Sequence, residues 1–157
     1  MELYLVRHGI AQELQEAASD PERRLTAEGR EKTARVARGF RERISRLDVI
    51  FHSTYLRAEE TARIFSAEFP RAKLVCANGL TPHDEPKSAL PLLSAVGEGE
   101  AIMIVGHEPH LSSLASRLLT GKDQPLVEFK KAGIAGFEFL PDLQHCRLNF
   151  LLSPKWL

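Results

Sequence analysis

Two unbroken apolar runs along the chain predict strands that are buried on both faces. The first covers residues 3–6 and the second covers residues 101–105. Neither run alternates with polar residues, and this pattern is typical of the central strands of a parallel sheet. Shorter runs at 48–52 and 73–77 predict two further strands of the same sheet.

The segments between these strands show apolar residues at helical spacing. Apolar residues at helical spacing predict an amphipathic helix over about 27–46, with Thr26 as its N-terminal cap. Gly29 interrupts this helix, and the pattern gives no reason for it beyond close packing. The same criteria predict three more helices: one that follows a cap at Ser53-Thr54 and ends at Pro70, a shorter one over about 88–96, and one from Pro109 to Gly121.

The C-terminal part of the chain holds two further β-like segments. They cover about 133–140 and 145–152, and Pro141-Asp142 separates them, so they are expected to form a hairpin that extends the sheet. The alternation of strands and helices predicts an α/β protein, a three-layer α/β/α sandwich with a mostly parallel central sheet. A length of 157 residues fits a single domain over 1–157.

Composition and charge exclude some classes of function. The chain has 21 basic and 21 acidic residues, so its net charge gives no signal for a nucleic-acid or membrane-surface partner. No apolar run reaches the length of about 18 residues that a membrane span needs. Arg7 and His8 interrupt the short apolar run near the N-terminus, so we expect no secretion signal. Cys76 and Cys146 lie in apolar segments, and we expect two buried, reduced thiols in a cytoplasmic protein.

Polar side chains gather where three predicted strands end. Because the carboxyl ends of parallel strands share one edge of a sheet, these side chains are expected to converge there. Two arginines and two histidines beside helix N-termini form a site for a tetrahedral oxyanion such as phosphate. The first strand delivers Arg7, His8 and Gly9, the turn after the second leads to Ser53 and Arg57, and the fourth ends in Gly106-His107.

Each of these side chains has a plainer interpretation when it is taken alone. A single histidine at a strand end is usually a satisfied polar residue, and a single arginine on a helix is usually solvated. Their joint occurrence at strand ends favours one shared pocket. His107 and His110 are three residues apart, but Pro109 lies between them and no cysteine or acidic cluster surrounds them, so we expect no metal site and no cofactor.

Four motifs in this order resemble the histidine phosphatase superfamily, the phosphoglycerate mutase-like proteins. The resemblance covers residue 2 to about residue 120, and the short chain is most similar to the bacterial phosphohistidine phosphatases of the SixA type. The motifs are Leu-Val-Arg-His-Gly at 5–9, Leu-Thr-Ala-Glu-Gly at 25–29, Ser-Thr-Tyr-Leu-Arg-Ala-Glu-Glu-Thr-Ala at 53–62 and Val-Gly-His at 105–107.

The resemblance implies a metal-independent mechanism. His8 would attack phosphorus and form a covalent phosphohistidine, while Arg7, Arg57 and His107 would hold the phosphoryl oxygens. An imidazole nucleophile must be neutral, and the two adjacent arginines disfavour its protonated form. Further residues that would bind phosphate or line the rim of the site are Gly9, Ser53, Asp84 and Glu85.

One departure from the family pattern concerns the acid that protonates the leaving group. The corresponding loop offers His83, Asp84 and Glu85, and none is an unambiguous match. A phosphoramidate nitrogen can be protonated before its bond breaks, so this favours a phosphorylated protein carrying phosphohistidine as the substrate. The alternatives are a phosphatase or mutase for small phosphate esters and, in another class, a non-catalytic phosphate-binding module.

Overall fold

The computed structural model describes residues 1–95, 97, 99–139 and 146–157, and a six-stranded sheet forms its centre. The strand order is β3-β2-β4-β1-β5-β6. The first four strands are parallel to one another, whereas β5 and β6 are antiparallel to their neighbours, so the sheet is mostly parallel as predicted. The strands are β1 (Glu2–Arg7), β2 (Val49–His52), β3 (Lys73–Cys76), β4 (Ala101–Gly106), β5 (Ile134–Phe139) and β6 (Cys146–Leu152). The predicted turn at Pro141-Asp142 lies outside the described residues.

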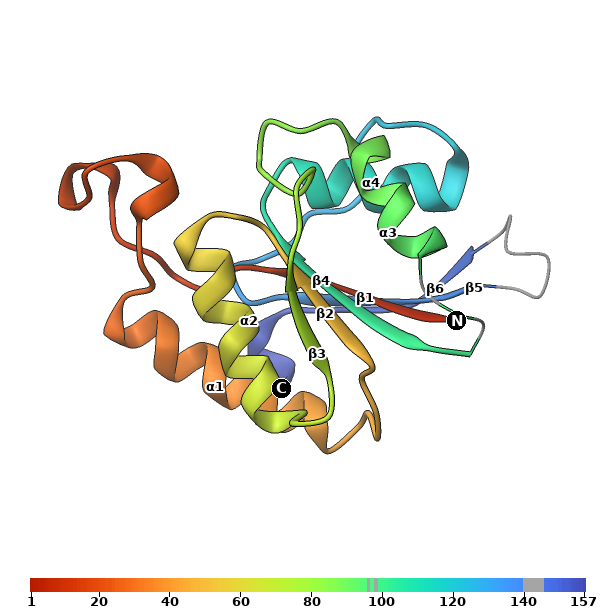
Figure 1. Ribbon diagram of the computed structural model, residues 1–157, viewed down its shortest axis with the longest axis horizontal. Coiled ribbons are helices and arrows are strands. Elements are labelled where there is room, and N and C mark those ends of the chain that lie inside the picture. Colours follow the sequence, from red (N-terminus) through yellow and green to blue (C-terminus); the bar gives the residue numbers. More distant parts are fainter. Residues whose placement is uncertain (96, 98, 140–145) are drawn as a thin grey trace.

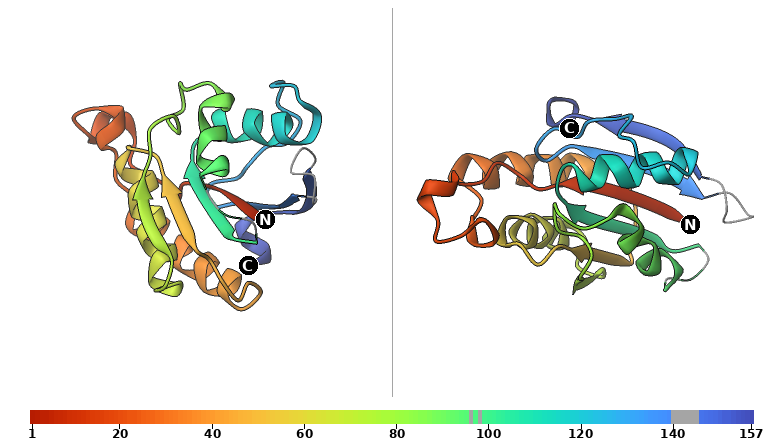
Figure 2. Two further views of the ribbon diagram at one scale, coloured as in Figure 1. Left: turned by 45° about the vertical axis from the view of Figure 1, so that its right-hand side comes forward. Right: turned by 90° about the horizontal axis from the view of Figure 1, so that it is seen from above.

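Helices cover both faces of this sheet and complete the predicted three-layer sandwich. Helices α1 and α2 lie on one face, and α3 and α4 lie on the other (Figures 1 and 2). The α-helices are α1 (Ala27–Arg41), α2 (Leu56–Glu68), α3 (Leu90–Ser94) and α4 (His110–Thr120). Short 3-10 turns are η1 (Leu14–Glu16), η2 (Asp20–Glu22), η3 (Pro86–Ala89) and η4 (Pro154–Trp156). None of the helices in the described ranges is long and apolar enough to cross a membrane.

The two central strands, β1 and β4, supply the middle of both apolar layers. Successive side chains of a strand point to opposite faces, so one strand contributes to two clusters. Tyr4 and Val6 belong to the layer under α1 and α2, whereas Leu5 belongs to the layer under α4. These three side chains are at most 3% exposed. A strand that is buried on both faces leaves only its ends for chemistry.

Three predicted helix boundaries were wrong. Helix α1 ends at Arg41, not near residue 46, because the N–H of Arg43 bonds to the Phe40 carbonyl three residues back and tightens the turn that follows the helix. The segment predicted as one helix over about 88–96 holds the end of η3 and the short helix α3, which ends at Ser94; residue 96 lies outside the described residues. Helix α2 begins at Leu56, with Tyr55 and not Ser53-Thr54 at its N-cap position.

The prediction of two buried thiols was also wrong. Cys76 is exposed because β3 is an edge strand of the sheet, and Cys146 is partly buried; both thiols are free. Gly29, which the helical pattern left unexplained, has a packing reason. A Cβ at this position would lie 1.9 Å from the carbonyl oxygen of Ile10, so only glycine lets α1 approach the segment that follows β1.

Candidate active site

The carboxyl ends of β1, β2 and β4 bring the predicted side chains together at one edge of the sheet. Arg7 of β1 pairs with Gly106 of β4, so the next residues of the two strands, His8 and His107, become neighbours. Their ring centroids are 5.0 Å apart. Arg57 reaches the same point from the first turn of α2. Together with the adjacent Arg7, these side chains form a compact group of two imidazoles and two guanidinium groups.

The hydrogen bonds of His8 define its tautomer. Its Nδ1 lies 2.7 Å from the carbonyl oxygen of Gly9, which can only accept, so Nδ1 carries the proton. Its Nε2 lies 3.2 Å from Nε of Arg57, which can only donate, so Nε2 presents a lone pair. His8 is therefore held as a neutral imidazole with a nucleophilic nitrogen facing Arg57.

Burial keeps this imidazole neutral. The His8 side chain is 7% exposed, and burial, reinforced by the positive charges of Arg57, Arg7 and Lys131, lowers the pKa of His8 to about 3. Desolvation disfavours the charged form of a histidine, and nearby cations act in the same direction. The nitrogen thus stays available as a nucleophile at neutral and moderately acidic pH.

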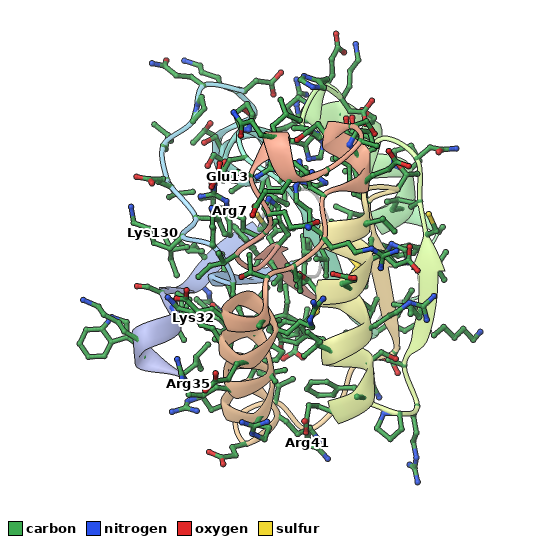
Figure 3. The ribbon with its side chains drawn as sticks, turned by 90° about the vertical axis from the view of Figure 1, so that its left-hand side faces the viewer. Arg7, Glu13, Lys32, Arg35, Arg41 and Lys130 are labelled. Carbon is green, nitrogen blue, oxygen red and sulfur yellow. The ribbon has the colours of Figure 1, made fainter. Side chains whose placement is uncertain are left out.

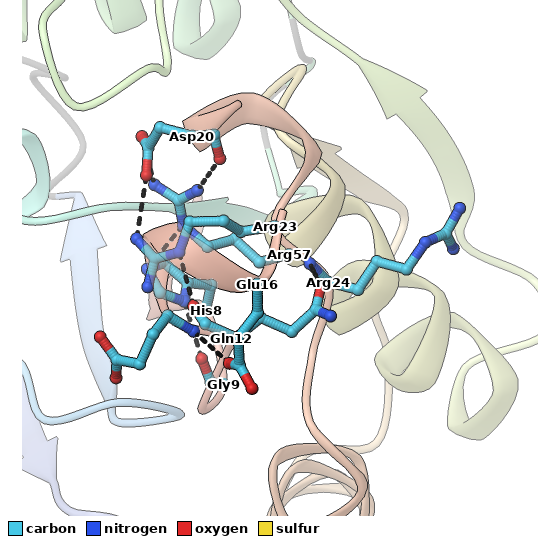
Figure 4. A network of polar contacts seen from close by, with 9 residues as sticks. His8, Gly9, Gln12, Glu16, Asp20, Arg23, Arg24 and Arg57 are labelled. Carbon is cyan, nitrogen blue, oxygen red and sulfur yellow. Dashed lines mark hydrogen bonds and ion pairs between the residues drawn. The ribbon is translucent and has the colours of Figure 1, made fainter. Parts of the chain in front are cut away.

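Asp20 holds Arg57 in place from the loop between β1 and α1 (Figure 4). The Arg57 Nη1 donates to the backbone carbonyl of Asp20 at 2.6 Å, and Nη2 lies 3.2 Å from its carboxylate. Arg23 bonds to the same carboxylate at 2.9 Å. Burial by itself would raise the pKa of Asp20, but the two guanidinium groups outweigh it and lower that pKa. The carboxylate therefore stays charged and fixes the guanidinium beside His8.

A guanidinium carries five N–H groups. Within the part of the chain that the structure describes, three of those on Arg57 have partners, which leaves two to bind an anion. The Cζ atom of Arg57 also lies 4.9 Å from the centroid of the Tyr55 ring. Arg57 is only 4% exposed, although a single arginine on a helix is usually solvated.

Arg7 is anchored from the segment before β5. Its Nη1 donates to the carbonyl of Phe129 at 2.6 Å. The backbone N–H of Phe129 in turn donates to the Glu108 carboxylate at 2.7 Å. Glu108 also accepts the hydroxyl of Ser112 at 2.7 Å. The buried Nε of Arg7 has no hydrogen-bond partner among the described residues. This donor is free to bind an anion at the strand ends.

Both ring nitrogens of His107, beside His8, lack hydrogen-bond partners among the described residues, although the side chain is 1% exposed. Its ring lies 5.0 Å from those of His8 and Tyr55. Burial is the main reason that the pKa of His107 falls to about 2; the charge of Arg57 acts in the same direction, as does His8 whenever that ring is protonated. A neutral, buried imidazole without a partner is suited to donate to an oxyanion that enters the site.

Other predicted residues have different surroundings. Gly9 lies inside the site, where its N–H donates to Thr61 of α2 at 3.0 Å, which ties the segment after β1 to the helix that carries Arg57. Ser53 is completely buried at the end of β2, and its hydroxyl lies 3.4 Å from the Tyr55 amide. It supports the turn into α2.

The three acid candidates are engaged or exposed elsewhere. The Asp84 carboxylate accepts the N–H of Thr81 at 2.7 Å, and this bond helps to keep the pKa of Asp84 low. Glu85 is exposed and pairs with Lys87 at 2.6 Å. His83 is exposed as well. None of the three makes a hydrogen bond to Arg7, His8, Arg57 or His107 in the described part of the structure.

The motifs did not identify three residues that shape the site. Asp20 and Glu108 lie in none of the four motifs, and Tyr55 lies in the motif at 53–62 without an assigned role. Asp20 could have been found from charge, because a buried arginine such as Arg57 needs a carboxylate partner and the loop after β1 is acidic.

Comparison with known proteins agrees with this geometry. The sequence matches the family model described as histidine phosphatase superfamily (branch 1) over residues 3–81, which is half of the chain. The chain belongs to the histidine phosphatase superfamily. It is also 32% identical, over 100% of this chain and 99% of the relative, to an uncharacterized protein of a Picosynechococcus strain.

Several solved structures share the fold of this chain. A structure of the protein histidine phosphatase SixA complexed with tungstate superposes with a TM-score of 0.87 at 24% identity and covers 99% of this chain and 98% of that one. A phosphoserine phosphatase of Entamoeba histolytica, in complex with phosphoserine, gives a TM-score of 0.75 at 18% identity, with 99% and 98% coverage. The fold thus occurs in phosphatases that differ in substrate.

Proposed function

We propose that this protein is a phosphohistidine phosphatase that acts through a covalent phosphoryl intermediate on His8. The observation that carries the proposal is the fixed neutral tautomer of His8, whose Nε2 lone pair lies 3.2 Å from Nε of Arg57. The unsatisfied nitrogens of His107 and Arg7 support an anion site around this nucleophile. The proposal treats 1–157 as one phosphatase domain, since all six strands belong to one sheet.

The reaction would proceed in two displacements. The phosphoryl group of the substrate first replaces Nε2 of His8 as the acceptor of the hydrogen bond from the Arg57 Nε–H. Nε2 then attacks phosphorus as the P–N bond of the substrate breaks. The electron pair of that bond leaves with the substrate imidazole. A water molecule next attacks phosphorus, the bond to Nε2 breaks, and the proton of the water passes to the released phosphate. Arg7, Arg57 and His107 stabilise the charge of both transition states.

Among the described residues none of the acid candidates bonds to His8, and this favours a nitrogen leaving group. The Glu108 carboxylate lines the same pocket as Arg7, but it already accepts hydrogen bonds from the Phe129 N–H and the Ser112 hydroxyl. An alcohol leaving group needs a proton from such an acid. A phosphohistidine ring can take up a proton first and leave as neutral imidazole.

One observation favours the second candidate, a small phosphate ester. A pocket of about 540 Å³ adjoins Arg7, and its other walls include Pro109, Leu126 and Val127. Pockets of this size hold small organic ligands, and apolar walls suit their carbon skeletons.

A substrate panel tests the proposal. Initial rates are measured with a protein phosphorylated on histidine, phosphoserine, a sugar phosphate and a generic aryl phosphate, each with wild type and His8→Ala. We expect the highest kcat/KM on phosphohistidine. A higher kcat/KM on phosphoserine or the sugar phosphate would assign the protein to small esters, and the absence of turnover on all four would leave a phosphate-binding module.

A further inference from the structure

A second concave surface, lined by basic side chains, lies beside the candidate active site. This basic groove encloses about 750 Å³. Two of its cations, Lys32 and Arg35, are three residues apart on α1 and therefore lie on the same face of that helix. Its five cations come from three separate segments of the chain: Lys32, Arg35, Lys130, Lys131 and Lys155.

The groove begins where the site ends. Ile10 lines it, two residues after His8. On the other side, the amide of Ala132, which follows Lys131, donates to the carbonyl of Arg7 at 3.1 Å. Lys131 is also close enough to His8 to help lower its pKa. Figure 3 shows Arg7, Lys130, Lys32 and Arg35 on one side of the molecule, in that order away from the site.

The positive charge of the groove is largely uncompensated. Lys130 pairs with Glu128 at 2.8 Å, whereas Lys32, Arg35 and Lys155 form no ion pair within the described residues. The chain as a whole has no net charge, so this concentration of cations is local. Concentrated positive charge speeds the association of a negatively charged partner and selects for it.

An exposed aromatic side chain at the groove suits a protein partner. Trp156 is 64% exposed, and Nζ of the groove residue Lys155 lies 5.1 Å from its ring. Exposed tryptophan and arginine are the side chains that contribute most to protein interfaces.

We propose that the basic groove binds an acidic segment of the phosphorylated protein substrate, next to the phosphohistidine that enters the site. This inference rests on the proposed function, because it requires a protein substrate. It adds a recognition surface outside the catalytic group, with charge as the basis of selection.

The first experiment compares two phosphohistidine peptides that differ only in having glutamates or glutamines beside the modified residue. We expect wild type to hydrolyse the glutamate peptide with a roughly tenfold higher kcat/KM, because several exposed ion pairs form with the groove. About 0.5 M NaCl should remove the difference, since it shortens the screening length to about 4 Å. Lys32→Glu/Arg35→Glu should abolish the preference and leave turnover of an aryl phosphate unchanged.

The matched control is Arg71→Glu/Lys73→Glu, which makes the same change of charge on exposed residues just before and within β3, at the edge of the sheet away from β5 and β6. This control should keep the preference for the glutamate peptide. Equal kcat/KM of wild type on the two peptides would overturn the groove proposal and leave the phosphohistidine phosphatase intact.

A second measurement does not depend on catalysis. Trp156 is the single tryptophan of the chain, so its fluorescence reports on occupation of the groove. Titration with the unphosphorylated glutamate peptide should change this signal in wild type and not in Lys32→Glu/Arg35→Glu. This response, together with no hydrolysis of either peptide, would reject the proposed function alone. Tighter binding of an oligouridine than of the peptide would overturn the assignment of the groove to an acidic protein.

Discussion

Arg57 donates its Nε–H to Nε2 of His8 over 3.2 Å, so the lone pair of the candidate nucleophile is in contact with a guanidinium before any substrate binds. A phosphoryl group that enters must replace His8 as the acceptor of this N–H. The same side chain would thus orient the imidazole at rest and bind the phosphoryl oxygens during the reaction. Predictions about both residues follow from this contact.

The first prediction concerns the covalent intermediate. Rapid quench of wild type with labelled phosphohistidine substrate should trap an acid-labile, base-stable phosphoryl adduct, and peptide mapping should locate it on His8. His8→Ala should abolish turnover, and phosphate binding through Arg7 and Arg57 should largely survive. The control His83→Ala removes an exposed histidine and should keep the adduct. If His8 is only a ligand, His8→Ala should lower the rate by about 10²–10³ and wild type should form no adduct.

The second prediction concerns the shape of the Arg57 side chain. Arg57→Lys keeps the positive charge but removes the Nε–H that faces His8 and the planar group that Asp20 holds. We expect kcat/KM on an aryl phosphate to fall by about 10²–10³. The same exchange at Arg63, an exposed residue of α2 that pairs with Glu59, should leave kcat/KM unchanged. Near-wild-type activity of Arg57→Lys would show that charge alone suffices.

The third prediction concerns Asp20. Asp20→Asn removes the ion pair to Arg57 and keeps the backbone carbonyl that accepts Nη1. We expect kcat/KM to fall roughly tenfold, the typical effect of one lost hydrogen bond to a charged group. Glu22→Gln, on the same 3-10 turn, is the control and should have no effect. A rise in kcat/KM would show instead that the Asp20 carboxylate competes with phosphate for Arg57.

The fourth prediction links His8 and His107, the two buried histidines of the candidate site, to stability at acid pH. Their pKa values fall from 6.5 to about 3 for His8 and about 2 for His107, mainly through burial. The unfolded chain therefore binds more protons than the folded protein below pH 6.5, and the free energy of unfolding falls as the pH falls. Near pH 5 the two groups together should contribute a slope of about 2.7 kcal/mol per pH unit.

Denaturant titrations between pH 5 and 6 measure this slope, in a window above the titration of most carboxylates. His8→Asn and His107→Asn should each reduce the slope by about half of that contribution. His83→Asn, at an exposed position, should leave the slope as in wild type. An unchanged slope in both buried variants would exclude these histidines as its source.

Hydrophobic periodicity predicted the layers of the fold because the burial of strands and helices repeats at short, fixed intervals. It was less accurate at helix ends such as Arg41, where a tightened turn, and not a change of pattern, ends the helix. The same limit applies to β3. Its sequence has strand character, but only the strand order makes it an edge and leaves Cys76 exposed.

The sequence by itself determined that Arg7, His8 and His107 meet at one edge of the sheet. Each follows an apolar run, and parallel strands end on the same side, so their meeting depends on local pattern and strand direction alone. Only the tertiary structure decided how these side chains are held. Asp20 reaches Arg57 across 37 residues and Phe129 reaches Arg7 across 122. Such partners depend on where loops fold back over the sheet, and no local periodicity encodes that path.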